Sequence, residues 1–280
     1  MSVSSTSAIG GLRGRGATMR TMSAWPLWCS GLLLVVGVPV VAVAAQLALR
    51  RRWSVLREGD HNEVAGFLIA IVGVIYAVLL AFVVIVSWQQ FSRAGDTVGQ
   101  EASALRTIER TAAAFPPEPH ARIRADVLDY ARTVVALEWP AMSRGEPGAP
   151  AVGATLDRLS IDIEALPADT PARAQFVGAE AERFNDLVSA RSSRLDFVEQ
   201  GLPGVLWAAL IVGAVVTIAF SMIFALSSRL LQVLMTGSIA VLIGILLFVA
   251  VAIDHPFVGD VAVTPGSLQR VLADFPGPPA

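Results

Sequence analysis

The stretch VAGFLIAIVGVIYAVLLAFVVIVSW occupies residues 64–88, and it decides the fold because it is predominantly apolar and carries no charge. A hydrocarbon layer about 30 Å thick requires roughly 20 apolar residues in a helix that rises about 1.5 Å per residue. Four uncharged runs of the chain meet this length: residues 25–49, 64–92, 200–228 and 230–253. The sequence therefore predicts an all-α membrane protein with four transmembrane helices.

Most charged residues lie between the second and third of these runs. Of the 44 charged residues, 29 fall within residues 93–199, where 12 arginines are outnumbered by 17 acids. We therefore predict a leader at 1–24, transmembrane helices 1 and 2 within 25–92, a water-exposed helical domain at 93–199, a hairpin of transmembrane helices 3 and 4 at 200–253, and a C-terminal tail at 254–280. No basic face dominates the inserted domain, so nucleic acid is not an expected partner.

The first 24 residues are rich in Ser, Thr, Gly and Arg and contain no acid, which predicts a flexible basic leader, with Met19 or Met22 as alternative starts. The small-x-small sequence at 42–44 has the form of a signal-peptide cleavage site. We expect a retained membrane helix instead, because the apolar run is long and stops at three consecutive arginines. Cys29 is the single cysteine, which excludes an internal disulfide, and we expect it to be a small apolar side chain of that helix.

The inserted domain has the pattern of a helical bundle. Apolar residues recur every three or four positions from residue 93 to 115, which predicts one helix face continuous with the second span. We expect the next helix to run from Pro119 to about Glu138 and to end before Pro140. Thr170 and Pro171 have the pattern of an N-cap and a first-turn proline, which begin the last helix of the domain. The face from 93 to 115 consists of Val98, Ala102, Leu105, Ile108, Ala112 and Phe115.

One arginine lies on the expected apolar face of the last helix of this domain. Arg191 is on this face, while Glu101 and Glu109 lie near the facing edge of the first helix, so we predict a structural ion pair within the bundle. The alternative is a ring of charge near a channel mouth, formed when copies of the chain assemble. The apolar face consists of Val177, Phe184, Val188, Leu195 and Val198.

Small residues recur every three or four positions in three of the spans, and such rows let helices approach closely in lipid. The second span has Gly73, Ala77 and Ala81, the third has Gly213, Thr217 and Ser221, and the fourth has Gly237, Ala240 and Gly244. Two topologies stay open, because arginines flank the spans in similar number on both sides.

The sequence contains no signature of catalysis: no phosphate-binding Gly-Lys loop, no GxGxxG, no HExxH and no GxSxG. Its three histidines are scattered among expected loops. We therefore expect no enzymatic activity, no cofactor and no metal. The spans contain no acid, base or histidine, which disfavours a coupled transporter. A pore lined by apolar side chains stays open as an interpretation.

Three blocks of the sequence resemble the bacterial bestrophin-like domain family, DUF4239. They are NEVAGFLIAIVGVIYAVLLAFVVIVSWQQF at 62–91, QEASALRTIERTA at 100–112, and the closing DHPFVGD with its following LQRVL. The resemblance covers roughly residues 25–272. It implies a distant similarity to bestrophins, which are pentameric anion channels with four membrane spans and a helical cytosolic portion.

The resemblance also suggests which residues carry function. By position, the second span is the pore-lining helix, and the candidates for an apolar neck are Ile71, Ile75, Val78 and Phe82. The tail is similar to the bestrophin segment in which Pro-Phe-Gly precedes acids that bind calcium; the matching residues are Asp254, Pro256, Phe257, Gly259 and Asp260. Calcium takes six to eight oxygen ligands. Because the acidic run is absent here, we expect no calcium site, and we expect Asp254 to cap or pair locally.

We therefore expect a bestrophin-like, multi-pass protein of the cell membrane, in contact with the lipid bilayer. We expect it to form a homo-oligomer. Its expected function is that of a passive ion channel, with anions as the expected ions, or of a channel-related protein. The alternative is a non-conducting membrane scaffold or sensor whose helical domain binds a partner.

Overall fold

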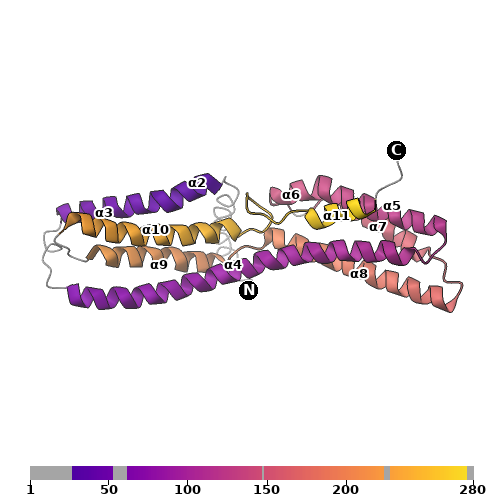
Figure 1. Cartoon of the computed structure of the whole chain (residues 1–280), viewed down its shortest axis with the longest axis horizontal. Coiled ribbons are helices and arrows are strands. Elements are labelled where there is room, and N and C mark those ends of the chain that lie inside the picture. The colour runs from indigo at the N-terminus through magenta and orange to yellow at the C-terminus, as the bar shows by residue number, and fades with distance from the viewer. Residues whose placement is uncertain (1–26, 53–61, 147, 224–227, 276–280) are drawn as a thin grey trace, which may run out of the picture. The chain divides into compact units, whose positions relative to one another are not determined.

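The computed structural model describes residues 27–52, 62–146, 148–223 and 228–275, and every regular element within these ranges is helical. The predicted leader and its alternative start sites lie outside the described residues. The chain divides into two compact units (Figure 1). We call the one within Met1–Gln89 and Gly201–His255 the membrane unit, and the one within Gln90–Gln200 and Pro256–Ala280 the polar unit.

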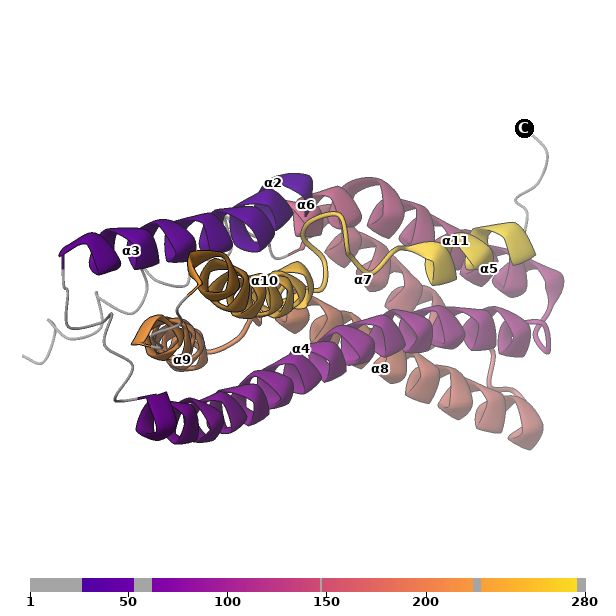
Figure 2. The ribbon, with the colours of Figure 1, turned by 60° about the vertical axis from the view of Figure 1, so that its left-hand side comes forward.

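The membrane unit confirms the four predicted transmembrane helices. The first consists of α2 (Leu27–Gly31), the π-helix η1 (Leu32–Gly37) and α3 (Val38–Arg52). The second is the N-terminal part of α4 (Asn62–Ala112), and the third and fourth are α9 (Gly204–Ile223) and α10 (Arg229–Ile253). All four are long and apolar enough to cross a bilayer. Within this unit α10 lies between α3 and α9 (Figure 2).

Two glycines of the membrane unit allow its helices to approach one another closely. A Cβ atom on Gly213 of α9 would overlap the ring of Tyr76 on α4. A Cβ atom on Gly244 of α10 would overlap the carbonyl oxygen of Leu34 in η1. These contacts confirm the close packing predicted for the small residues of the third and fourth spans.

Each of the two described π-helical turns precedes a proline: η1 comes before Pro39, and η4 (Val134–Glu138) comes before Pro140. Proline has no N–H to donate, and its ring would collide with the carbonyl group four residues earlier. The wider π-turn changes the hydrogen-bond pattern at that point, so that the helix can continue. The expectation that the helix ends before Pro140 is therefore wrong, because η4 leads into α6 (Trp139–Ser143).

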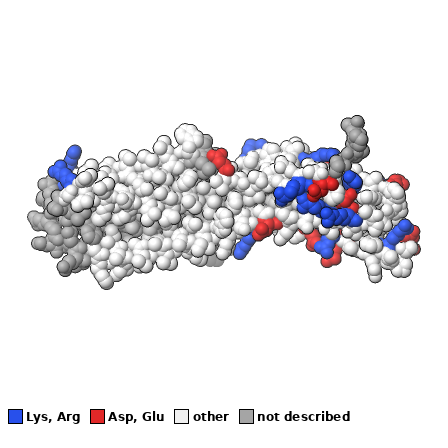
Figure 3. Space-filling model, in the orientation of Figure 1, with Lys and Arg blue, Asp and Glu red and all other residues white. Residues whose placement is uncertain are grey.

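The polar unit consists of the C-terminal part of α4, α5 (Pro117–Thr133), η4, α6, α7 (Pro150–Glu164), α8 (Pro171–Glu199) and α11 (Gly266–Asp274). The six residues predicted to form one helix face from 93 to 115 are all buried in its core, which confirms that face as far as Ala112, where α4 ends; Phe115 is buried from the turn that follows. From α11, Leu268 and Val271 enter the same core. On the face shown in Figure 3, charged side chains gather over the polar unit and are nearly absent from the membrane unit.

Helix α8 begins as predicted, and four of the five residues of its predicted apolar face pack in or against the core: Val177, Phe184, Leu195 and Val198. The Thr170 hydroxyl accepts a hydrogen bond from the backbone N–H of Arg173 at 3.2 Å, which confirms the N-cap. Val188 was expected to be buried but is 39% exposed, whereas its neighbour Leu187 is fully buried. The predicted apolar face is therefore wrong at this position, and the polar residues Glu180 and Arg194 lie on the buried side.

Candidate functional site

The four candidate pore-lining residues form one stripe along the membrane part of α4. All four are exposed in the single chain, from 42% for Ile71 to 66% for Val78. At about 100° per residue, the stripe lies roughly 140° around the helix from the face that fills the core of the membrane unit. The stripe consists of Ile71, Ile75, Val78 and Phe82, and the buried face of Tyr76, Leu80, Val83 and Ser87.

A row of small residues lies on a flank of α4, between the exposed stripe and the buried face. No described atom outside the helix backbone and the adjacent residues lies within 4 Å of the position that a Cβ on Gly73 would take. Ala77 and Ala81 are exposed. This flank therefore offers a second helix a surface for close approach in lipid.

Asp254, the first residue of the tail motif, joins the ends of α9 and α10 within the membrane unit. Its Oδ1 accepts a hydrogen bond from the backbone N–H of Leu202 at 2.7 Å, and its Oδ2 lies 3.2 Å from Nδ1 of His255. Both side chains are buried. A Cβ on Gly201 would lie 3.0 Å from the His255 ring, so a larger residue there would press on the imidazole. The carboxylate thus pairs locally, as expected.

The remaining motif residues form a turn of the polar unit. The Pro256 carbonyl accepts a hydrogen bond from the Val263 N–H at 2.8 Å. Phe257 is buried and meets Trp139 edge-on, with ring centroids 5.6 Å apart. Gly259 has φ +92°, a left-handed conformation that favours glycine. Asp260 is exposed. Within the described ranges, no three or more His, Cys, Asp or Glu side chains converge as metal ligands.

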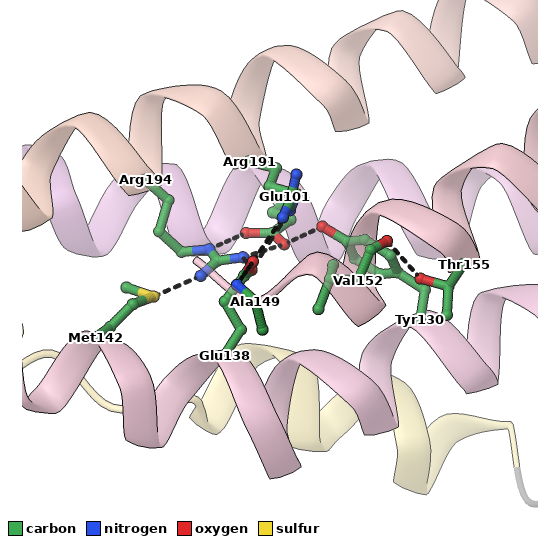
Figure 4. Close-up of polar contacts among 9 residues, drawn as sticks. All are labelled: Glu101, Tyr130, Glu138, Met142, Ala149, Val152, Thr155, Arg191 and Arg194. Atoms are coloured by element: carbon green, nitrogen blue, oxygen red, sulfur yellow. Dashed lines mark hydrogen bonds and ion pairs between the residues drawn. The ribbon is translucent and has the colours of Figure 1, made fainter. Parts of the chain in front are cut away.

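A buried charge cluster lies at the centre of the polar unit, and Arg194 of α8 is its hub (Figure 4). Arg194 and the carboxylates of Glu101 and Glu138 are all fully buried. The guanidinium donates to Glu101 Oε2 at 2.6 Å, to Glu101 Oε1 at 3.1 Å and to Glu138 Oε2 at 2.6 Å. Arg191 donates to Glu138 Oε1 at 2.6 Å. Two arginines therefore neutralise two carboxylates.

Neutral groups donate further hydrogen bonds to the two carboxylates of this cluster. The Tyr130 hydroxyl donates to Glu101 at 2.5 Å, and the Ala149 N–H donates to Glu138 at 3.1 Å. Burial raises the pKa of Glu138, but the hydrogen bonds from Arg191 and the charge of Arg194 outweigh this effect and hold it below its ordinary value. Burial, together with the charge of Glu101, raises the pKa of Tyr130, so the phenol stays protonated and donates.

The sequence prediction found only part of this cluster. It identified Arg191 and Glu101, but it paired them with each other and added Glu109, whereas Arg191 binds Glu138 and Glu109 lies 3.3 Å from His120. Arg194 and Glu138 were missed. The available signal was the spacing of three residues between Arg191 and Arg194, which puts both guanidinium groups on one side of α8.

The comparisons with known proteins agree with this architecture. A family model described as "Bestrophin-like domain" matches residues 36–268. No curated protein matches the sequence. The fold is similar to that of a point variant of a bacterial bestrophin homologue from Klebsiella pneumoniae, with 17% identity, a TM-score of 0.59, and coverage of 96% of this chain and 100% of that chain. It is also similar to two crystal structures of variants of a membrane protein, each with 15% identity to this chain. The first has a TM-score of 0.62 and covers 96% of this chain, and the second has a TM-score of 0.63 and covers 88%. Both of those chains are covered in full.

Proposed function

The chain belongs to the bestrophin-like domain family, and from this premise we propose that copies of it assemble in the cell membrane into a passive ion-conducting pore lined by α4. The observation that carries the proposal is the exposed apolar stripe formed by Ile71, Ile75, Val78 and Phe82. In a ring of copies, the face of α4 opposite its own unit is the face available to line a central axis.

The small-residue flank supports the assembly. A ring requires each α4 to contact a neighbouring copy beside the pore-lining face. Gly73, Ala77 and Ala81 supply such a surface, since short side chains bring helix backbones together in lipid. The homo-oligomer is therefore part of the proposal.

The chemistry of the stripe favours a passive pore with an apolar constriction. A ring of isoleucine, valine and phenylalanine offers an ion no ligand, so such a neck controls passage by its wetting and width. The uncharged runs contain no Asp or Glu that would concentrate cations. They contain no Arg or Lys either, so anions are the expected permeant ions because the family resemblance implies them, and we propose no enzymatic step.

Anion flux through liposomes that contain the purified chain tests the proposal. In a Cys29→Ser background, we expect a negatively charged thiol reagent to reduce the flux through Ile75→Cys and Val78→Cys variants. A matched control is Val215→Cys on α9, which is 62% exposed in the single chain but belongs to a different span. Modification of the control should leave the flux unchanged.

Two results would contradict the proposal. Absence of flux, with the purified chain monomeric in detergent, would favour a non-conducting scaffold or sensor. Flux that is equally sensitive to modification at residue 215 would show that the sensitivity is not specific to α4, and it would contradict α4 as the pore-lining helix.

A further inference from the structure

A groove of about 390 Å³ lies between α4 and α8 within the polar unit, and its lining carries charges of both signs. Arg93 and Asp96 come from α4, and Asp196 and Phe197 come from α8. The amides of Gln100 and Gln200 add hydrogen-bond donors and acceptors. The groove is separate from the buried charge cluster and from the exposed stripe of α4.

The charged groups of this groove form no ion pair with one another. Arg93 and Asp96 are three residues apart on one helix, the spacing at which Arg183 and Asp186 of α8 form an ion pair at 2.7 Å. Nevertheless, none of Arg93, Asp96 and Asp196 forms an ion pair with any residue in the described part of the chain. One guanidinium and two carboxylates are therefore available to a ligand that carries both charges.

Along the chain, the groove residues of α4 directly follow the second uncharged run, and those of α8 directly precede α9. Arg93 is the first charged residue after the uncharged run at 64–92, and Gln200 lies four residues before the start of α9 at Gly204. At about 1.5 Å per residue, positions 93–100 of α4 extend over roughly 10 Å beyond that run. The uncharged run is longer than the roughly 20 residues that cross the hydrocarbon core, so its end and Arg93 lie near the lipid headgroups, which add about 5–8 Å to each side of that core.

We propose that this groove binds the phosphoethanolamine headgroup of a bilayer lipid. The planar guanidinium of Arg93 is suited to the phosphate. The ammonium group meets the carboxylates of Asp96 and Asp196, and the half-buried ring of Phe197 adds an aromatic face for a cation. The lipid, rather than a free phosphoethanolamine, is the proposed occupant, because α4 continues without a break from the second span to the groove residues. This inference goes beyond ion conduction and does not depend on it.

The test measures lipid retention by the full-length chain in detergent. The protein is mixed with equal amounts of phosphatidylethanolamine and phosphatidylglycerol of the same acyl chains, and bound lipid is counted by native mass spectrometry. We expect preferential retention of phosphatidylethanolamine. Asp196→Asn and Arg93→Gln should each reduce this retention about tenfold, since each removes a charge-assisted contact.

Matched controls come from the same two helices. Glu182→Gln on α8 and Arg110→Gln on α4 remove exposed charges outside the groove, and both should retain lipid as the unmodified chain does. Melting temperatures of all four variants establish that they fold. Water-soluble glycerophosphoethanolamine at the same concentration should not displace the lipid.

Each other outcome overturns the proposal. Equal retention of phosphatidylglycerol would show that the carboxylates do not select the headgroup. Groove variants that behave like the controls would place the bound lipid elsewhere. Displacement by the soluble headgroup would assign the groove to a free metabolite-sized ligand instead of a bilayer lipid.

Discussion

Replacing Arg194 with methionine should destabilise the polar unit more than almost any other single substitution. The substitution keeps a long side chain but removes three charge-assisted hydrogen bonds of 2.6, 2.6 and 3.1 Å to two fully buried carboxylates. Glu138 keeps Arg191 and the Ala149 N–H, whereas Glu101 keeps only the Tyr130 hydroxyl among the residues that the structure describes. The main cost is therefore the uncompensated charge of Glu101.

The expected loss is about 3–5 kcal/mol, the range found when one partner of a buried ion pair is removed. In a unit of this size, each kcal/mol of lost unfolding free energy lowers the melting temperature by about 3 °C. We therefore expect the Arg194→Met variant to melt roughly 10 °C lower than the unmodified chain. The assay is thermal unfolding of the detergent-solubilised chain, followed by circular dichroism and tryptophan emission. Trp139 reports locally, because the Arg194 guanidinium lies 5.7 Å from its ring centroid.

Two further variants separate the buried charge from other effects. Adding Glu101→Gln to the Arg194→Met variant should restore about half of the lost stability, because the orphaned carboxylate becomes a neutral amide. Arg183→Met removes an exposed arginine that pairs with Asp186 on the same helix, and it should cost about 0.5 kcal/mol or less. A melting temperature of Arg194→Met within about 2 °C of the unmodified chain, or no rescue by Glu101→Gln, would refute the reasoning.

Three other substitutions have defined expected outcomes. Burial and the neighbouring carboxyl of Asp162 raise the pKa of Asp126 to about 6. A raised carboxyl pKa in the folded state stabilises the fold at low pH, and this contribution is lost as pH rises from about 4 through 6. Asp126→Asn should remove this dependence and raise the melting temperature at pH 7.5; an unchanged melting curve from pH 4.5 to 7.5 in both chains would contradict it. Gly213→Ala places a methyl group against the Tyr76 ring and should cost about 1–3 kcal/mol, seen as earlier unfolding in detergent. Glu180 is fully buried, and neither carboxylate oxygen has a hydrogen-bond partner in the described part of the chain. Glu180→Met should therefore stabilise the protein by about 1–2 kcal/mol. A lower melting temperature of this variant would instead reveal a partner of the carboxylate.

The sequence was most informative where one physical requirement acts on many residues at once. An uncharged apolar run long enough to cross the hydrocarbon layer is rare in proteins that fold in water, so the four spans could be predicted. The same holds for the buried face of α4, because Val98, Leu105 and Ile108 repeat at the helical period and are all buried.

Prediction failed where a single contact decides the outcome. Pro140 was expected to end a helix, but η4 accommodates it through a local change of hydrogen bonding. Arg194 was missed because an arginine without a known partner is expected at the surface. It is buried because Glu101 and Glu138, which lie 93 and 56 residues away in the sequence, accept its hydrogen bonds. Such pairs are set by tertiary packing, which no local pattern records.

The two units use charge in opposite ways, and this contrast constrains the proposed pore. The polar unit buries Arg194 with two carboxylates and adds the half-buried Arg191, because paired charges with satisfied hydrogen bonds are tolerated inside a protein. The uncharged runs of the membrane unit contain no Asp, Glu, Lys, Arg or His, and the buried Asp254–His255 pair of that unit follows the end of α10. Coupling transport to a proton gradient requires such a group to bind and release a proton. Ions that pass through a pore lined by α4 should therefore move down their own electrochemical gradient. The protein should not accumulate an ion against that gradient.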